Sequence, residues 1–195
     1  MISAILLAAG QSKRMKGSNK LLFKYKNKTL INYILKSLVK SKVNKIIVVL
    51  GYESKKVKIA ALKSKKITFA TNPKYSKGIS TSIKCGLKKI SKKNVGFLIA
   101  HGDMPLVSKK IFNTLCAALK NKNKNKKIFV PVYKKKVGNP LAFKYSMIKS
   151  FRKIKGDRGA KKLIRSNKSM VKKVKVNSKS ILIDFDQPKD FPSAT

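Results

Sequence analysis

Small residues and cations come together where the first apolar segment of the chain ends. Residues 2–7 are apolar apart from one serine, and the small residues of 8–10 follow directly. Lys13, Arg14 and Lys20 come next. Small side chains let a backbone approach a ligand closely, and a tight turn aims several N–H groups the same way. The pattern indicates a polyphosphate pocket; an ordinary strand-to-loop turn with surface lysines is the alternative.

Spacing excludes two better-known phosphate-binding loops. A P-loop requires G-x-x-x-x-G-K-[ST], and neither Gly10 nor Gly17 has the second glycine and the Lys-Ser/Thr pair in place. The dinucleotide fingerprint requires G-x-G-x-x-G, but Ser12 stands two residues after Gly10. A phosphate loop at this position would therefore be of a third kind.

The acidic residues are the second set of chemical candidates, because the chain has only six of them against 49 Lys and Arg, for a net charge of +43. They are Glu53, Asp103, Asp157, Asp184, Asp186 and Asp190. Asp103 follows the apolar segment 95–100, and Mg²⁺ takes carboxylate together with phosphate oxygens. We therefore expect Asp103 to bind Mg²⁺, with a helix or turn cap as the alternative. Asp184 and Asp186 would point the same way on a strand, and one or both could complete the metal site or simply gather surface lysines.

His101 is the only histidine. It could be a general base, but it follows an apolar strand, and we favour a packed neighbour of the site. A phosphate monoester needs no such base, because its second pKa is about 6 and it is largely dianionic at neutral pH. Its attack on the α-phosphorus of a nucleotide requires charge neutralisation and alignment, which lysine, arginine and Mg²⁺ can supply.

The elements that must position these residues alternate along the first half of the chain. The patterns predict strands at residues 2–7, 45–50, 67–71 and 95–100, and helices at 29–40, 57–62, 80–90 and 111–119. Alternation with short connections predicts a single α/β domain over residues 1–195, Rossmann-like and three-layered, with a mostly parallel central sheet. Ligands of such sheets bind beyond the carboxyl ends of the strands. The glycine loop and the Asp103 turn should therefore lie at the same edge, which favours the phosphate-binding interpretation.

The second half of the chain has shorter and less regular patterns. They predict strands at 128–132, 141–143, 171–176 and 181–185, helices at 146–154 and 159–166, and the start of a terminal helix at 188–191. The lysine-asparagine run 120–127 is expected to be a solvated surface connection.

Composition excludes several classes of protein. An apolar content of 43% argues against a disordered basic tail, and no apolar run is long enough to span a membrane. Cys85 and Cys116 lack the spacing of metal ligands, fit reduced thiols and favour a cytoplasmic location. The lysines are spread from end to end and arginine is scarce, so a basic nucleic-acid-binding protein remains only as the alternative from another class.

Six segments, taken in order, resemble motifs of the nucleotidyltransferase superfamily, and of its molybdenum cofactor branch in particular. LAAGQSKRM with KLL at 20–22 resembles LAAGxSxRMG…KLL, and the segment from Asn72 to Gly86 resembles NPxWxxGxxxSxxxG. GDMPLV at 102–107 resembles GDQPLV, and GNP at 138–140 resembles G[HN]P. GDRGA at 156–160 resembles GDxGAR, and DFDQPKD at 184–190 resembles DIDTPED.

This resemblance implies transfer of CMP from CTP to the terminal phosphate of a molybdopterin cofactor, with release of pyrophosphate and with Mg²⁺ as cofactor. It implies nucleotide contacts from Leu7, Ala8, Ala9, Gly10, Ser12, Arg14, Lys20, Gly78, Ser80 and Ser82. It also implies catalytic roles for Arg14, Lys20 and Asp103, Mg²⁺ binding by Asp103 and Asp186, and acceptor contacts from Asn139 and Asp157. A molybdoenzyme that receives the product is an implied partner.

The alternatives within the enzyme class are transfer to another small phosphate, such as a sugar phosphate, and guanylyl transfer. The Ala-Ala-Gly form at residues 8–10, in place of Ala-Gly-Gly, resembles the cytidylyl branch. Four positions depart from the motifs: Lys16 before Gly17 shifts a glycine, Tyr75 replaces tryptophan, Met104 replaces glutamine and Gln187 replaces threonine. Since none of them removes a proposed phosphate or metal ligand, they bear on the acceptor more than on the nucleotide.

Overall fold

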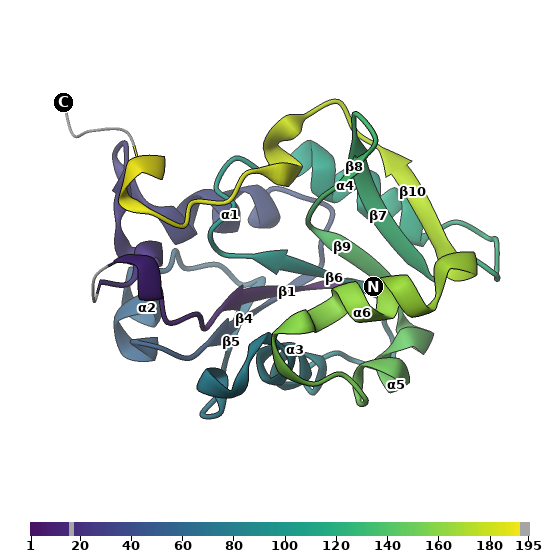
Figure 1. Ribbon diagram of the computed structural model, residues 1–195, viewed down its shortest axis with the longest axis horizontal. Helices are drawn as coiled ribbons and strands as arrows, with labels where there is room; N and C mark the ends of the chain where they lie inside the picture. The colour runs from purple at the N-terminus through teal and green to yellow at the C-terminus, as the bar shows by residue number, and fades with distance from the viewer. Residues whose placement is uncertain (16–17, 192–195) are drawn as a thin grey trace.

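A mixed β-sheet forms the centre of the protein (Figure 1). The structure is a computed structural model, and it describes residues 1–15 and 18–191. The expected glycine shift at Lys16-Gly17 lies outside these residues. The sheet has eight strands. Seven of them lie in the order β10-β7-β9-β6-β1-β4-β5, and the eighth, β8, pairs with β7. The strands are β1 (Ile2–Ala8), β4 (Lys45–Leu50), β5 (Ile67–Thr71), β6 (Gly96–His101), β7 (Ile128–Tyr133), β8 (Lys136–Val137), β9 (Leu141–Lys144) and β10 (Val171–Lys175). A small hairpin, β2 (Lys24–Tyr25) with β3 (Lys28–Thr29), stands apart.

The sheet is mostly parallel, as predicted. β1 pairs in parallel with β4 and β6, β4 with β5, and β7 with β10. β9 runs antiparallel between β6 and β7. The chain moves from β1 outward to β4 and β5, and then returns to the other side of β1 as β6. This reversal is the topological switch point, where open α/β sheets leave a crevice beyond the strand ends.

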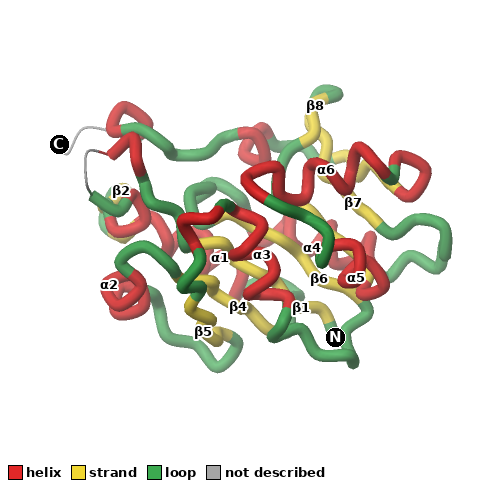
Figure 2. Tube along the Cα trace, turned by 60° about the horizontal axis from the view of Figure 1, so that its bottom comes forward, coloured by secondary structure: helices red, strands yellow, loops and turns green. Residues whose placement is uncertain are grey.

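Helices cover both faces of the sheet, which gives the expected three layers (Figures 1 and 2). α1 (Leu30–Val39), α2 (Ser54–Ala60) and α4 (Lys109–Leu119) pack on one face, and α3 (Ile79–Leu87), α5 (Ile148–Phe151) and α6 (Gly159–Ser166) on the other. β1 is buried along its whole length because its alternate side chains enter both cores: Leu6 packs with the first set and Ile5 with the second. A continuous apolar run is what a strand covered on both faces requires.

α3 lies unusually close to the sheet because Gly86 faces it. A Cβ atom added at Gly86 would stand 2.6 Å from Cγ2 of Ile5 and 3.1 Å from Cγ2 of Val49. The helix therefore approaches β1 and β4 directly, which brings its N-terminal turn over the end of β1. Within the described residues, no helix has the length and apolar character needed to cross a membrane.

Three predicted elements differ from the structure. The strand expected at 181–185 is wrong: a 3₁₀ turn, Lys179–Leu182, leads into an extended stretch outside the sheet. Its backbone makes single bonds to separate elements instead of a ladder, since Asn139 N donates to Ile181 O (2.9 Å) and Phe185 N donates to Asp103 O (2.8 Å). The helix expected at 146–154 is only the short α5 preceded by a 3₁₀ turn, and residues 188–190 form one 3₁₀ turn.

Candidate active site

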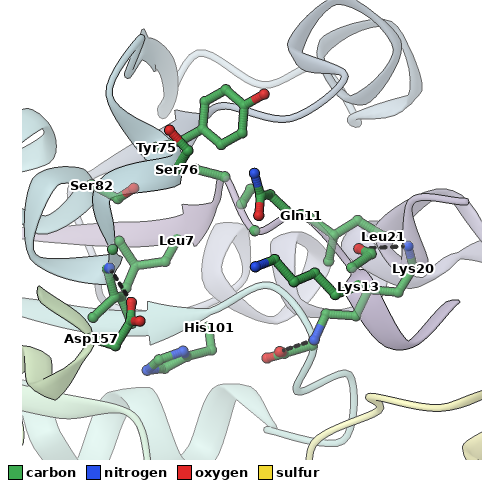
Figure 3. Close-up of a pocket in the computed structure, with 17 residues that line it drawn as sticks. Leu7, Gln11, Lys13, Lys20, Leu21, Tyr75, Ser76, Ser82, His101 and Asp157 are labelled. Atoms are coloured by element: carbon green, nitrogen blue, oxygen red, sulfur yellow. Dashed lines mark hydrogen bonds and ion pairs between the residues drawn. The ribbon is translucent and has the colours of Figure 1, made fainter. Parts of the chain in front are cut away.

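A cavity of about 380 Å³ lies at the switch point, beyond the carboxyl ends of β1 and β6 (Figure 3). Residues from the loop after β1, the start of α3 and the turn after β6 line it. Among the residues predicted for the site, those that line this cavity are Leu7, Ala8, Ala9, Gly10, Ser12, Lys20, Gly78, Ser82, Asp103 and Asp157. Segments far apart in the sequence thus meet where the topology requires.

The loop after β1 is folded so that it presents Lys20. Ser12 has a left-handed backbone (φ 53°), and its Oγ accepts a hydrogen bond from Lys20 N at 3.1 Å. Buried Asn19 accepts from Leu21 N (3.1 Å) and donates to Tyr52 O (3.3 Å), which anchors the 3₁₀ turn Lys20–Leu22. A Cβ atom at Gly10 would meet nothing within 4 Å, so the space above the loop is open to a ligand.

Lys20 contacts both carboxylates that were expected to bind metal. Its Nζ lies 2.5 Å from Oδ2 of Asp103 and also forms an ion pair with Oδ1 of Asp186. The Lys20 side chain is 13% exposed. Burial acts to lower the pKa of Lys20, but the charges and hydrogen bonds of Asp103 and Asp186 outweigh it and raise that pKa above its usual value. The Asp103 carboxylate therefore faces the site and does not cap the following helix.

Arg14 stands at the rim of the site. Its guanidinium pairs with Oδ2 of Asp186 at 2.9 Å, while its side chain is 67% exposed. It does not line the cavity in this structure. Asp186 is thus held by two cations, Arg14 from the solvent side and Lys20 from the inside.

The N-terminal end of α3 forms the opposite wall. Asp157 accepts a hydrogen bond from Ile79 N (3.1 Å) at the first turn of the helix (Figure 3). Gly78 has a φ of +99°, and a Cβ there would stand 2.8 Å from Oδ1 of Asp157. Ser82 lines the cavity and accepts a hydrogen bond from Nδ2 of Asn72 (3.0 Å), whereas Ser80 is buried and does not line it.

A second cavity of about 210 Å³ adjoins the first, and the two share Ile79, His101, Asp103 and Asp157 as lining residues. Its further polar lining residues are Asn139, Lys161 and Asp184. Much of the remaining wall is apolar and comes from Ile83, Ile99, Met104, Leu141 and Ala160. The structure thus separates Asn139 from the glycine loop and brings it to a neighbouring space that opens onto Asp103.

His101 lies at the wall common to the two cavities, where β6 ends. Its pKa is lowered, chiefly because burial disfavours the charged imidazolium; the charge of Lys20 adds to this effect, and Asp103 and Asp184 oppose it. This lowered pKa favours the neutral imidazole at pH 7.

Several lining residues were not among the residues predicted for the site. Gln11, Lys13, Tyr75 and Ser76 line the larger cavity, and in Figure 3 the Gln11 and Lys13 side chains extend toward its middle. Lys13 had been noted only as one cation of the loop, and in a chain with 49 Lys and Arg a further lysine carries little signal. Lys161 follows the predicted segment 156–160 by one residue and lines the smaller cavity.

The donor set at this site suits Mg²⁺ that is shared with a substrate. No cluster of three or more His, Cys, Asp or Glu side chains able to hold a metal was found among the described residues. Two carboxylates, Asp103 and Asp186, nevertheless meet at one cation, the ammonium of Lys20. Mg²⁺ is commonly bound by one or two carboxylates together with substrate phosphates, so the residues present fit that ion.

Comparison with known proteins finds relatives in sequence and in fold. The chain is 25% identical over 194 residues to the molybdenum cofactor cytidylyltransferase of Escherichia coli (strain K12), covering 99% of this chain and 95% of that protein. The crystal structure of Rv0371c from Mycobacterium tuberculosis H37Rv has the same fold, with a TM-score of 0.82, 24% identity, and coverage of 97% of this chain and 94% of that one. A complex of Rv0371c with manganese matches with a TM-score of 0.79, 23% identity, and coverage of 97% and 95%.

The family model of the MobA-like NTP transferase domain matches residues 4–172, a stretch that runs from β1 into β10 and contains the glycine loop, Lys20 and Asp103. By this match, and by the fold and site just described, the chain belongs to the MobA-like NTP transferase domain family of nucleotidyltransferases.

Proposed function

We propose that this nucleotidyltransferase uses Mg²⁺ to transfer CMP from CTP to the terminal phosphate of a molybdopterin cofactor, with release of pyrophosphate. The proposal rests on one observation. The Lys20 ammonium forms ion pairs with the carboxylates of Asp103 and Asp186, beside the cavity that the loop after β1 lines. The similarity to the E. coli cytidylyltransferase along nearly the whole chain supports the choice of reaction.

On the nucleotide side, the loop backbone at residues 8–10 would face the base and ribose. Lys13 and Lys20 line the cavity, and Arg14 stands at its rim, so three cations surround the place proposed for the triphosphate. Asp103 and Asp186 would hold Mg²⁺, which when bound neutralises phosphate charge. In the structure, the Lys20 ammonium forms ion pairs with these same two carboxylates.

The proposed chemistry requires no general base from the chain. A phosphate oxygen of the acceptor attacks the α-phosphorus of CTP, a new P–O bond forms, and the bond from the α-phosphorus to the bridging oxygen breaks as pyrophosphate leaves. The attacking phosphate is already largely deprotonated at neutral pH. The roles left to Lys20, Arg14 and Lys13 are to align the phosphates and to stabilise their charge.

The smaller cavity is the place proposed for the acceptor. Its wall combines apolar residues with the amide of Asn139 and the carboxylates of Asp157 and Asp184. Such a wall suits the flat, hydrogen-bonding ring system of a pterin better than it suits a sugar, whose hydroxyls need a partner on every side. We place the reaction in the cytoplasm, in keeping with the two free thiols, and a molybdoenzyme would receive the product.

Thermal shift with CTP, GTP or ATP, each with and without Mg²⁺, tests the nucleotide part of this proposal. We expect CTP with Mg²⁺ to raise the unfolding midpoint selectively, because a ligand that binds only the folded state stabilises it. An equal response to every nucleotide and to heparin, abolished by moderate salt, would mean that bulk charge binds polyanions and that the chain has no selective nucleotide site.

A further inference from the structure

We infer that Asp190 is a positioning residue: it fixes the backbone of Asp186 so that the Asp186 carboxylate meets Lys20. The inference rests on the proposed function in one respect, namely that Asp186 takes part in binding Mg²⁺. The segment from Asp184 to Asp190 lies beyond residue 172, where the match to the family model ends.

The Asp190 carboxylate binds two consecutive backbone amides, an arrangement that we call a clamp. Its Oδ2 accepts hydrogen bonds from Asp186 N at 2.8 Å and from Gln187 N at 2.7 Å. In return, Asp190 N donates to Gln187 O at 2.9 Å, which closes the 3₁₀ turn Pro188–Asp190. Hydrogen bonds to a charged carboxylate are shorter and stronger than those between neutral groups. The two peptide planes that flank the Cα atom of Asp186 are therefore held by a single carboxylate.

This clamp matters because the segment around Asp186 has no strand partner among the residues that the structure describes. Phe185 fixes the residue before Asp186, since its N donates to Asp103 O at 2.8 Å and its ring packs against Tyr25 (centroids 5.1 Å apart). Asp190 fixes the residue itself and the one after it. The ring of Phe191 packs on the rings of Phe185 and Phe23, with centroids 5.4 Å and 5.5 Å apart. Phe23 directly follows the 3₁₀ turn that carries Lys20.

Asp190 itself stays out of the reaction space. It lines neither cavity, and the ion pairs of Lys20 and Arg14 go to Asp186 and Asp103. Its influence on catalysis must therefore pass through the position of Asp186. Outer partners that orient metal ligands typically change metal affinity or activity by about 10- to 100-fold when they are removed.

The test compares Asp190→Ala with Asp190→Glu, because Glu commonly makes the same reach-back bond at the third position of a helical turn. Glu53→Ala is the matched control: it also removes one acid, which pairs with Lys56 and lines neither cavity. Two measurements are made on each full-length protein. The first is hydrogen exchange at the amides of Asp186 and Gln187. The second is the Mg²⁺ concentration that half-saturates pyrophosphate release from CTP in the presence of the molybdopterin cofactor.

We expect Asp190→Ala to exchange these two amides faster and to raise the half-saturating Mg²⁺ concentration by about 10- to 100-fold, while the KM for CTP at saturating Mg²⁺ stays near that of the wild type. Asp190→Glu should restore both values, and Glu53→Ala should change neither. If Asp190 only stabilised the fold, its loss would not raise the half-saturating Mg²⁺ concentration while leaving the KM for CTP unchanged.

The inference is overturned if Asp190→Ala keeps wild-type amide protection and Mg²⁺ dependence, or if Asp190→Glu is as impaired as Asp190→Ala. Failure of the proposed function would look different, because it would be seen in the wild-type protein itself, as no pyrophosphate release, release that is equal for every nucleotide, or release that does not depend on the cofactor. In that case the exchange measurement still decides on the clamp: faster exchange in Asp190→Ala alone supports it, and equal exchange in all four proteins overturns it.

Discussion

Replacing Lys20 with alanine removes the cation on which the two proposed metal ligands converge. The variant leaves Asp103 and Asp186, whose side chains are 19% and 31% exposed, facing each other without the ammonium between them. Arg14 remains on the outer side of Asp186, so that carboxylate keeps one partner. Asp103 has no other ion pair among the described residues.

The cost in stability follows from how buried the three groups are. Removing one partner of a fully buried ion pair costs about 3–5 kcal/mol, whereas an exposed pair is worth about 0–1 kcal/mol. This partly buried network lies between those limits, and we expect a loss of about 2 kcal/mol. For a domain of this size, each kcal/mol lowers the midpoint of thermal unfolding by about 2–4 °C, which gives about 4–8 °C here.

The raised pKa of Lys20 determines how the contribution of this residue to the free energy of unfolding changes with pH. A group whose pKa is higher in the folded than in the unfolded state stabilises the fold fully below its unfolded pKa, and this contribution disappears as the pH rises through the folded pKa. The stability difference between wild type and Lys20→Ala should therefore be complete at neutral pH and shrink in strongly alkaline solution.

The cost in rate follows from the proposed role of the same ammonium. Loss of one group that stabilises charge in a transition state lowers turnover by about 100- to 1,000-fold. Lys122→Ala is the matched control, because it removes one charge from the exposed run 120–127, away from both cavities. Scanning calorimetry without nucleotide and initial rates of pyrophosphate release measure the two effects. Equal midpoints and equal rates for the two variants would refute the assignment of a specific role to Lys20.

Three further predictions concern other parts of the molecule. Asp103→Asn should abolish Mg²⁺-dependent turnover while its circular dichroism spectrum remains native; undiminished turnover would remove Asp103 from the metal site. Gly78→Ala should lower the midpoint of unfolding by several degrees, because φ is +99° there and the new Cβ would clash with Asp157. Strain of this kind costs about 1–3 kcal/mol, and an unchanged calorimetric midpoint would contradict it. Burial raises the pKa of the Cys116 thiol to about 11, so Ellman's reagent at pH 8 should titrate only Cys85 rapidly in the folded protein, and two fast thiols would show that Cys116 is accessible.

The core of the fold could be predicted from local patterns. Apolar runs such as 2–7 and 45–50 are long, continuous and separated by helical periodicities, so they specify strands covered on both faces. The position of the candidate site could be predicted from the same patterns, because residues placed after two strands of a parallel sheet meet at one edge. The fold class and the family are confirmed, whereas the roles given to single residues remain predictions.

The segment that carries Asp186 could not be predicted in the same way. The apolar pattern of 181–185 suits a strand, yet Phe185 is buried under Tyr25 and Phe191, and its backbone bonds to the Asp103 turn. Contacts of this kind depend on where the chain arrives in space. The ion pair between Lys20 and Asp186 joins residues 166 positions apart, and no local pattern specifies it.

The central claim is that the Lys20–Asp103–Asp186 site transfers CMP from CTP to a molybdopterin phosphate. The most direct measurement is pyrophosphate release by the wild-type protein with CTP, GTP or ATP, with and without molybdopterin cofactor, in the presence of Mg²⁺. We predict release that requires CTP, Mg²⁺ and the cofactor together, and that is lost in Asp103→Asn. Release that is equal for all three nucleotides, or that is indifferent to the cofactor, would contradict the account.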